Sequence, residues 1–544
     1  MPMWGGRQSG ARAGGGDGRP YERLLRSRAG RGVAALCAGA LPALAFPAPS
    51  LWWLAYVALV PWLLLVRSAG TGRRAAVDGW IGGTGFMLAV HHWLMPSLHV
   101  FILVLAALLG LLWAPWGLLV SRLLGGSPSV RRSVAAVVVV PSGWLMIELV
   151  RSWQGLGGPW GLLGASQWQV PPALRVASVG GVWLLSLGVV AVNTVLTLLI
   201  ALPAARRAAG ACVLVGAVVV GAIAVWAPRP QESGRARIAV VQPGVVEGPG
   251  SVGRRFDRSE RLTRELAGRD VDLVVWGESS VGVDLSRSPG TADRLASLSR
   301  LVGADLLVNM DARRTDGPHS AGIYKSAVLV GPRGPTGDRY DKMRLVPFGE
   351  YVPARGVLGW ATSVGKAAGE DRLRGTAPVV MDVPGADGLR IGPLVCFETA
   401  FPDMSRELVR EGARLLVAQS STSTFQHSWA PAQHASLAAL RAAETGRPMV
   451  HATLTGVSVA YGPRGERLGA PIGTDDTAAT VYDVPLAHGT TLYVRLGAWP
   501  VYGALAVMAV FLGAAGARAV RTPTPRRPEG SARTAGGSPE RPGR

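Results

Sequence analysis

Lysine is almost absent from this chain of 544 residues, although 56 of its residues are Lys or Arg. The lysines are Lys325, Lys342 and Lys366. Arginine therefore occupies almost every basic position. Because a guanidinium cannot replace a compact, titratable amine, a retained lysine is a candidate for chemistry. Lys342 is the strongest of the three, because it belongs to the group of polar residues described below.

Cysteine is also scarce, and three residues provide no disulfide framework. Cys37 and Cys212 lie within long apolar runs, which leaves Cys396 as the cysteine with possible chemistry. Cys396 ends a strand-like apolar run and is followed two residues later by Glu398. Sites in α/β proteins usually lie at this end of a strand. The alternative is that Cys396 is a small buried hydrophobe, the commoner role of a lone cysteine.

The composition indicates a membrane protein joined to a more polar region. Hydrophobic residues make up 49% of the chain and the mean hydropathy is +0.27. The net charge of +21 does not indicate nucleic-acid binding, because the arginines lie at the termini and in short loops between apolar runs. Phospholipid headgroups explain that placement better. No metal or nucleotide motif is present in the sequence, so we expect neither a metal nor a cofactor.

Apolar runs near the length of a membrane-spanning helix predict a polytopic α-helical bundle of about eight spans, seven N-terminal and one C-terminal. The first two runs are short and interrupted by prolines, so a tight hairpin is the alternative there. The predicted spans are 33–48, 51–66, 79–98, 101–120, 134–150, 179–202, 211–227 and 496–516. Residues 1–32 and 517–544 are predicted to be disordered basic tails.

Arginine placement predicts the orientation in the cell membrane, because positively charged loops remain in the cytoplasm. Arginines cluster after the second, fourth and sixth spans and in the C-terminal tail. The clusters are Arg67, Arg73 and Arg74; Arg122, Arg131 and Arg132; Arg206 and Arg207; and Arg518, Arg521, Arg526 and Arg527. Both termini are therefore expected in the cytoplasm. The region between spans seven and eight, with a domain at 236–485, is expected outside it.

Several polar residues lie within or beside the predicted spans. Glu148, followed by Arg151, is either a functional intramembrane carboxylate or one member of a partner pair. His91 and His92 are expected to pack or hydrogen-bond, because no other metal-ligand types accompany them. The Gly- and Trp-rich segment 155–169 suits an interfacial loop, and lining a lipid entrance is the alternative.

The region after the seventh span alternates between strand-like and helix-like segments, which predicts an α/β domain with one large core. The expected strands are 237–242, 272–276, 305–309, 327–330, 389–396, 414–418 and 449–454, and the clearest helices are 259–267, 291–301, 404–411 and 431–444. Glu278, Lys342 and Cys396 lie near strand ends. Together they provide a base, a cation and a nucleophile, the groups required for acyl transfer through a thioester.

At these residues the sequence resembles the nitrilase superfamily, and with its membrane spans it resembles the apolipoprotein N-acyltransferase family over about 33–515. The segments that carry the resemblance are 144–151, 158–160, 240–242, 276–279, 340–353, 396–398, 433–434, 441–444 and 446–448. The resemblance implies an extracytoplasmic αββα sandwich. It assigns Glu278 as general base, Lys342 as the cation beside the oxyanion, and Cys396 as nucleophile. The supporting positions are Glu350, Phe397 and Glu398.

The same resemblance implies an acyl chain carried from a membrane phospholipid to Cys396 as a thioester. The acceptor would be the α-amine of the diacylglyceryl-modified N-terminal cysteine of a lipoprotein. A ping-pong scheme follows. The resemblance implies no cofactor, and we expect a monomer.

The sequence departs from the family pattern near these positions. Lys325 and Leu454 stand where asparagine is expected, Phe397 where tyrosine is usual, and 420–424 replaces an Asn-Asp pattern. Two other interpretations therefore stay open. One is a membrane-tethered nitrilase-type amidase, in which water replaces the amine. The other is a divergent paralogue with altered or lost activity. Residues 360–374 are either a mobile lid or an ordinary surface loop.

Overall fold

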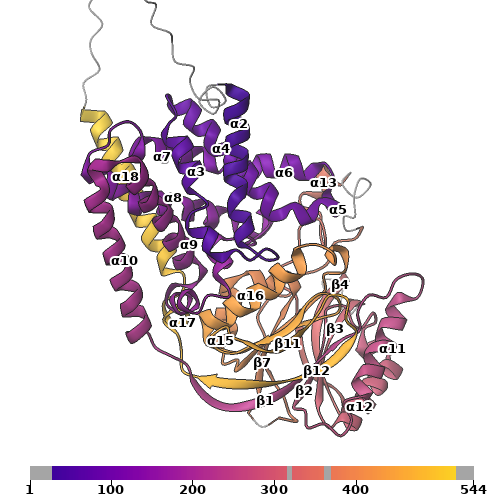
Figure 1. The fold of residues 1–544 in the computed structure, drawn as a ribbon. Helices are drawn as coiled ribbons and strands as arrows, with labels where there is room; N and C mark the ends of the chain where they lie inside the picture. Colours follow the sequence, from indigo (N-terminus) through magenta and orange to yellow (C-terminus); the bar gives the residue numbers. More distant parts are fainter. Residues whose placement is uncertain (1–26, 315–321, 360–368, 387, 522–544) are drawn as a thin grey trace, which may run out of the picture.

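The computed structural model describes residues 27–314, 322–359, 369–386 and 388–521 (Figure 1). Most of the two predicted tails lies outside the described residues, as does 360–368, the larger part of the possible lid. Figure 1 shows two parts stacked on one another, a helical bundle and an α/β part, joined through α10–β1 and again through β12–α17.

The helical part contains all of the predicted apolar runs, several of them as broken helices. The first two runs become short helical pieces, in agreement with the hairpin alternative. The helices are α2 (Arg28–Ala40), η1 (Leu41–Ala45), η2 (Trp52–Tyr56), α3 (Val60–Arg67), α4 (Gly72–His91), η3 (His92–Leu94), α5 (Met95–Leu98), α6 (Phe101–Gly110), α7 (Trp113–Leu124), α8 (Val130–Arg151), η4 (Gln154–Leu156), η5 (Leu163–Gln167), α9 (Pro171–Ala201), η6 (Pro203–Ala205), α10 (Arg206–Trp226), α17 (Leu492–Leu496) and α18 (Trp499–Arg521).

Five helical segments of the described chain are long and apolar enough to cross a membrane. They are Phe101–Leu124, Val130–Arg151, Pro171–Ala201, Pro203–Trp226 and Trp499–Arg518. Helix α4 has 20 residues but carries Arg73, Arg74 and Asp78 in its first turns. Glycines allow α4 to pack closely against α2. A Cβ on Gly39 of α2 would lie 1.9 Å from the carbonyl oxygen of Gly82 in α4. The count of eight spans and their sidedness stay predictions.

The α/β part contains two six-stranded sheets, with strand orders β12-β1-β2-β3-β4-β5 and β11-β10-β9-β8-β7-β6. The strands are β1 (Gln231–Gln242), β2 (Leu273–Trp276), β3 (Asp305–Arg314), β4 (Gly322–Gly331), β5 (Gly334–Asp341), β6 (Met381–Asp382), β7 (Arg390–Val395), β8 (Leu415–Ser420), β9 (Met449–Thr453), β10 (Ser458–Tyr461), β11 (Arg467–Ile472) and β12 (Ala478–His488). In each sheet the central strands β1-β2-β3 or β7-β8-β9 are parallel and the outer pairs are antiparallel.

The two sheets face each other and helices cover their outer faces, so the part is a four-layer α-β-β-α sandwich (Figure 1). Helices α11 (Ser251–Arg264) and α12 (Pro289–Val302) cover the first sheet; α15 (Pro402–Arg410) and α16 (Ala430–Thr445) cover the second. All seven predicted strands and four predicted helices are present. The prediction omitted β5, β6, β10, β11 and β12.

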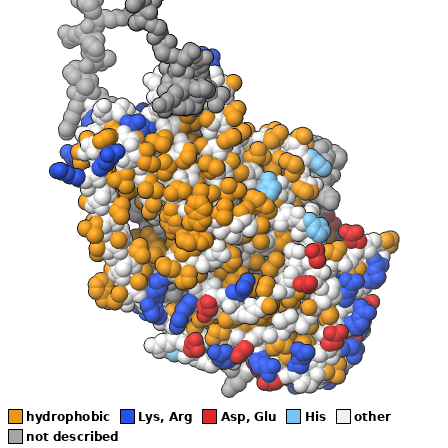
Figure 2. Space-filling view, viewed as in Figure 1, with side chains coloured by type: hydrophobic (Ala, Val, Ile, Leu, Met, Phe, Trp, Pro, Cys, Tyr) orange, Lys and Arg blue, Asp and Glu red, His pale blue; other side chains and the backbone are white. Residues whose placement is uncertain are grey.

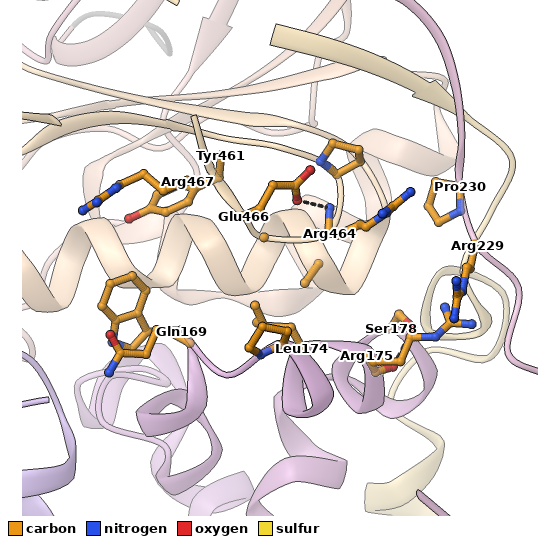
Figure 3. A pocket seen from close by; sticks show the side chains of 15 residues that line it. Gln169, Leu174, Arg175, Ser178, Arg229, Pro230, Tyr461, Arg464, Glu466 and Arg467 are labelled. Carbon is orange, nitrogen blue, oxygen red and sulfur yellow. Dashed lines mark hydrogen bonds between the residues drawn. The ribbon is translucent and has the colours of Figure 1, made fainter. Parts of the chain in front are cut away.

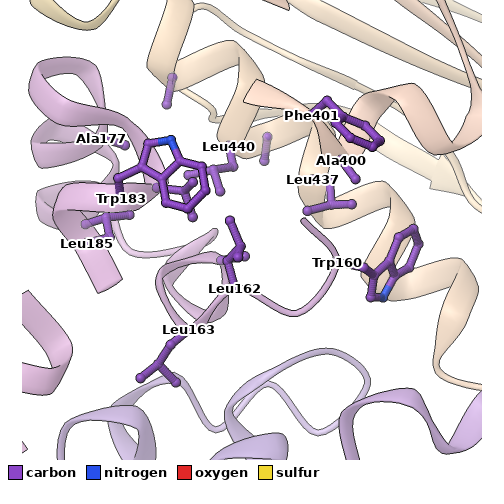
Figure 4. Close-up of a cluster of buried hydrophobic side chains, with 14 of the residues drawn as sticks. Trp160, Leu162, Leu163, Ala177, Trp183, Leu185, Ala400, Phe401, Leu437 and Leu440 are labelled. Carbon is purple, nitrogen blue, oxygen red and sulfur yellow. The ribbon is translucent and has the colours of Figure 1, made fainter. Parts of the chain in front are cut away.

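Helix α16, in the layer that covers the second sheet, packs against the membrane helices. One apolar core continues across the boundary between the α/β part and the helical bundle (Figure 4). Figure 4 shows Trp160 and Leu162 from the loop after α8, Trp183 from α9, and Leu437 and Leu440 from α16 around one buried cluster. Each fully buried side chain of this kind contributes about 1.5–3 kcal/mol. The two parts are therefore one packed unit, and the site described next lies close to their junction.

Candidate active site

Glu278 lies just beyond β2, where the chain closely approaches the backbone that follows β9 in the second sheet. A Cβ on the preceding Gly277 would lie 2.0 Å from the Leu454 backbone nitrogen, so only glycine fits. Ser279 has a φ of 56°, and its backbone nitrogen donates to Asn309 Oδ1 at 2.9 Å. Glu278 is 3% exposed. The local backbone thus fixes a buried carboxylate at the end of a parallel strand.

Lys342 follows β5 and is 1% exposed, which a lysine tolerates only with ionic partners. Its Nζ lies 3.3 Å from Glu278 Oε1 and 2.8 Å from Glu350 Oε1. Burial lowers the pKa of Lys342, but the two carboxylates outweigh burial and hold the pKa well above its usual value. The other oxygen of Glu350 accepts the Val346 backbone N–H at 2.8 Å. Lys342 is therefore a fixed, permanent cation.

Cys396 directly follows β7 and begins η8 (Cys396–Ala400) with a φ of 53°, in the left-handed region that non-glycine residues rarely adopt. This sharp turn directs the side chain away from the strand, where it is partly exposed. The surrounding protein still raises the pKa of the thiol by burial, and the Glu278 charge raises it further, to about 12. The resting group is therefore a thiol, with the Glu278 carboxylate close enough to raise its pKa.

Lys325 is the site residue that the sequence analysis left without a role. It lies on β4, and its Nζ is 2.8 Å from Glu278 Oε1 and 3.5 Å from Glu350 Oε1. Burial raises the pKa of Glu278, but the charges of Lys325 and Lys342 outweigh burial and lower the pKa to about 2. The signal that could have identified Lys325 is the scarcity of lysine itself.

Glu398 organises the loop that carries Lys342. Its Oε1 accepts from the Tyr340 hydroxyl and the Met343 backbone N–H, both at 2.7 Å, and from the Arg344 N–H at 2.9 Å. Its Oε2 accepts the Val395 N–H at 2.7 Å. Burial raises the pKa of Glu398, yet four donors fit the ionised carboxylate. One side chain thus connects the loop of the lysine to the turn of the cysteine.

Phe397 lies at the boundary with the membrane helices. Its ring meets Phe401 edge-on at a centroid distance of 5.0 Å. A Cβ on Gly158, in the loop after α8, would lie 2.6 Å from Phe397 Cζ, and the φ of Gly158 is +68°. The missing hydroxyl of the family's tyrosine is therefore replaced by apolar contact with the membrane loop.

Most of the segment 155–169 is buried, so the predicted interfacial role stays a prediction for its exposed residues Gly157 and Gln169. Glu148 Oε1 accepts the Trp144 indole N–H at 3.0 Å and the Leu163 N–H at 2.7 Å. Arg151 donates to the carbonyls of Trp160 and Gly161. Both charged residues bind the loop, and no direct Glu148–Arg151 ion pair is found within the described ranges.

The departures from the family pattern lie beside the site. The Ser420 carbonyl accepts both the Glu278 N–H at 3.1 Å and the Leu454 N–H at 2.8 Å. These contacts are made by the backbone, so they survive the side-chain changes. Further along the same segment, Phe425 meets Trp93 from η3 edge-on at 4.9 Å. The segment 420–425 therefore reaches from the carboxylate to the aromatic edge of the bundle.

His434 lies beside the site, and His91 and His92 lie at the end of α4 and the start of η3. The Nε2–H of His434, on α16, donates to the Cys396 carbonyl at 2.9 Å. Burial lowers the pKa of His434 to about 4, so the ring is neutral. His91 and His92 bond to the carbonyls of Met87 and Ala89, the hydrogen bonding predicted for them.

Glu278, Lys342, Cys396 and the supporting residues Glu350, Phe397 and Glu398 are thus gathered at one place. The structure of the α/β part agrees with the family model "Carbon-nitrogen hydrolase", which matches residues 237–491. This half of the chain has the nitrilase fold. The model "Apolipoprotein N-acyltransferase N-terminal domain" matches residues 38–195 of the membrane half.

Relatives over the whole length are named apolipoprotein N-acyltransferase. The protein from Geobacter metallireducens is 30% identical over 87% of this chain and 94% of its own length. Those from Azotobacter vinelandii and Pseudomonas aeruginosa PAO1 are 31% and 29% identical over 87% of this chain and 93% and 94% of their own. The chain belongs to the apolipoprotein N-acyltransferase family and is an acyltransferase.

A solved amidase from Nesterenkonia sp. is 21% identical, with a TM-score of 0.33 over 47% of this chain and 92% of the amidase.

Proposed function

We propose that this enzyme transfers an acyl chain from a membrane phospholipid to the α-amino group of the diacylglyceryl-modified N-terminal cysteine of apolipoproteins. The names of the full-length relatives support the acceptor. The observation that carries the chemistry is the partly exposed Cys396 thiol beside Glu278, whose carboxylate lies 3.3 Å from the Lys342 ammonium. The site adjoins apolar helices through Phe397, which suits a lipid donor.

In the first half-reaction Cys396 Sγ attacks the ester carbonyl of the phospholipid. The pKa of Cys396 is about 12 and that of Glu278 about 2, so a thiolate is not formed in advance. The thiol proton passes to Glu278 as the carbon–sulfur bond forms. Lys342 stabilises the oxyanion that develops on the carbonyl oxygen. When this intermediate collapses, the ester carbon–oxygen bond breaks and Glu278 returns the proton to the departing lysophospholipid alkoxide.

In the second half-reaction the lipoprotein α-amine attacks the thioester carbonyl. Glu278 accepts a proton from the amine, the carbon–sulfur bond breaks, and the proton passes to the departing Cys396 sulfur. The product is an amide and the thiol is restored. The two substrates use one site in turn, which is a ping-pong scheme. Glu350 supports this chemistry by holding Lys342, and Glu398 by holding the loop between Tyr340 and Arg344.

The proposal places the enzyme in the cell membrane as a multi-pass monomer of about eight spans. The bundle comprises 33–227 and 496–516, and the catalytic domain 236–485 lies outside the cytoplasm. Arginines after the even-numbered predicted spans support this orientation, with 1–32 and 517–544 in the cytoplasm. Both substrates then meet the site from the outer leaflet.

The test is acyl transfer by the purified full chain to a diacylglyceryl-cysteine peptide in vesicles of one phospholipid. The expected product is the N-acyl peptide with an equal amount of lysophospholipid, and neither should form with Cys396→Ala. A membrane-tethered amidase would instead release free fatty acid and leave the peptide unchanged. A divergent paralogue without activity would form no product at all. Either result would reject the proposal.

A further inference from the structure

A second site lies at the opposite end of α16 from Cys396. A cavity of about 650 Å³ is formed by the start of α9, the link from α10 to β1, the β10–β11 turn and the end of α16 (Figure 3). Its volume is typical of a ligand pocket. Helix α16 contacts Cys396 through His434 and the cavity through Ala443. Ala443 lies nine positions after His434 on this helix, which is about 13.5 Å along the axis at 1.5 Å per residue. The cavity is therefore separate from the acyl-transfer site.

Three arginines gather at one end of this cavity. Figure 3 shows Arg175 from α9, Arg229 from the link and Arg464 from the turn on the same side, with Arg467 at the other end. The charges of Arg229 and Arg464 both act on Arg175. Three converging cations repel one another unless an anion lies among them. We call these three residues and the space they line the arginine cavity.

None of the three arginines forms a side-chain ion pair in the part of the chain that the structure describes. One carboxylate, that of Glu466, lines the same space and accepts the Arg464 backbone N–H at 2.9 Å, so the four arginines of the lining outnumber it. Arg175 donates to the carbonyls of Pro228 and Ala227, and its Nε is buried without a partner among the described residues. An unpaired buried donor beside two further guanidiniums matches the oxygens of a phosphate group.

The arginine cavity lies where apolar helices end. Helix α9 begins at Pro171 and α10 ends at Trp226, and both are long and apolar enough to span a membrane. Trp226 is 79% exposed, as expected for an interfacial aromatic residue. Figure 2 shows basic side chains gathered along the lower limit of the hydrophobic surface. A phosphate bound here could carry acyl chains that continue along the exposed apolar face of α10.

We propose that the arginine cavity binds the headgroup phosphate of an anionic phospholipid, and that this lipid is distinct from the acyl donor at Cys396. Anionic lipid is favoured over zwitterionic lipid because a cationic headgroup amine would add to the positive charge of the arginines. The bound lipid would connect α9 and α10 to the β10–β11 turn, and so attach the membrane helices to the α/β part.

The test measures lipid retention by the full chain in nanodiscs containing equal amounts of phosphatidylglycerol and phosphatidylcholine. Native mass spectrometry counts the lipids that remain bound after release from the disc. Wild type should retain phosphatidylglycerol selectively, and Arg229→Gln/Arg464→Gln should reduce that retention by about tenfold or more. The matched control is Arg235→Gln/Arg254→Gln, which removes the same charge from exposed positions of the α/β part and should retain lipid as wild type does.

Two results would overturn the proposal. One is equal retention of phosphatidylglycerol by wild type and the Arg229/Arg464 variant. The other concerns displacement of the retained lipid. If inorganic phosphate displaces the bound phosphatidylglycerol as effectively as added phosphatidylglycerol does, the cavity is a site for the free anion. The double variant should elute with wild type in zwitterionic detergent. If it does not, Arg464→Gln alone replaces it, because the Arg464 side chain forms no hydrogen bond or ion pair in the described part of the chain. Thioester formation at Cys396 is measured separately, so failure here and failure of the proposed function are distinguishable.

Discussion

Replacing Lys325 with asparagine, the residue expected from the family pattern, should change the acid side of the pH profile of acylation. Lys325 Nζ lies 2.8 Å from Glu278 Oε1, and the Lys325 side chain is 14% exposed. With Lys325 and Lys342 present, the pKa of Glu278 is lowered to about 2. Glu278 therefore stays ionised, and able to accept the thiol proton, over the whole range in which the protein is expected to be folded.

The magnitude follows from this distance. Two unit charges 2.8 Å apart interact by about 6 kcal/mol at an effective dielectric constant of about 20, equivalent to roughly four pKa units. The asparagine amide and water recover part of this. Burial, the largest influence on Glu278, remains and raises its pKa. With Lys342 alone opposing burial, we expect the pKa of Glu278 to rise to between about 4 and 6.

The assay is the single-turnover rate of acyl-adduct formation at Cys396, measured between pH 4 and pH 9. Wild type should show no acid limb, because Glu278 is not protonated in that range. Lys325→Asn should show one, since protonated Glu278 cannot accept the thiol proton. Lys325→Arg keeps the charge and should resemble wild type, as should Arg235→Asn at an exposed position. An unchanged acid side in Lys325→Asn would refute the reasoning.

Three further changes test the structure around the site. Gly158→Ala places a Cβ 2.6 Å from the Phe397 ring and should lower the rate of acylation by about tenfold or more. The control is Gly157→Ala. The φ of Gly157 is 99° and no atom lies within 4 Å of its Cβ position, so this change introduces backbone strain without a clash and should lower the rate far less. Glu398→Gln directs an amide N–H at one of four donors, so urea unfolding should show a free energy of unfolding lower by about 1–3 kcal/mol. An unchanged urea midpoint would contradict the role of Glu398 as acceptor of these four hydrogen bonds. The pKa of His434 falls from 6.5 to about 4 on folding because of burial, so its stabilising contribution is complete above pH 6.5 and is lost as the pH falls toward 4. The melting temperature of His434→Gln should therefore decrease less over this range than that of wild type, and parallel decreases would exclude the effect.

The sequence predicted the central strands of the α/β part because parallel strands buried on both faces read as continuous apolar runs. It did not predict β5, β11 or β12, whose residues are partly exposed and interrupted by polar side chains. These antiparallel strands are defined by pairing with neighbours, which no local pattern reveals. The run 101–120 was predicted as one span and forms α6 and α7, because hydropathy does not register the two-residue turn at 111–112 between them.

For the site, sequence reasoning selected Glu278, Lys342 and Cys396 from residue type and position after strands, and the structure brings them together. The role of Lys325 could not be predicted because it depends on register. Pairing of β4 with β3 sets Lys325 opposite Asp311, and its Nζ then reaches Glu278. The arginine cavity was missed for a similar reason. Arg175, Arg229 and Arg464 are far apart in sequence and meet only when α16 packs on α9.

The contact between Phe397 and Gly158 gives the membrane helices a physical connection to catalysis. The loop after α8 is bound at one end by Glu148 and Arg151 and meets the nucleophile turn at the other. Gln154 Nε2 also donates to the Leu345 carbonyl at 2.9 Å, in the loop that follows Lys342. Movement of this loop would therefore displace the nucleophile turn and the lysine loop together.

The most direct measurement of the central claim is the intact mass of the purified chain after incubation with phospholipid alone. We expect an increase of one acyl group on wild type and none on Cys396→Ala, with lysophospholipid appearing in equal amount. Hydroxylamine should remove the added mass, as expected for a thioester. An unchanged mass of wild type without lysophospholipid, or an adduct that persists in Cys396→Ala, would contradict acyl transfer through Cys396.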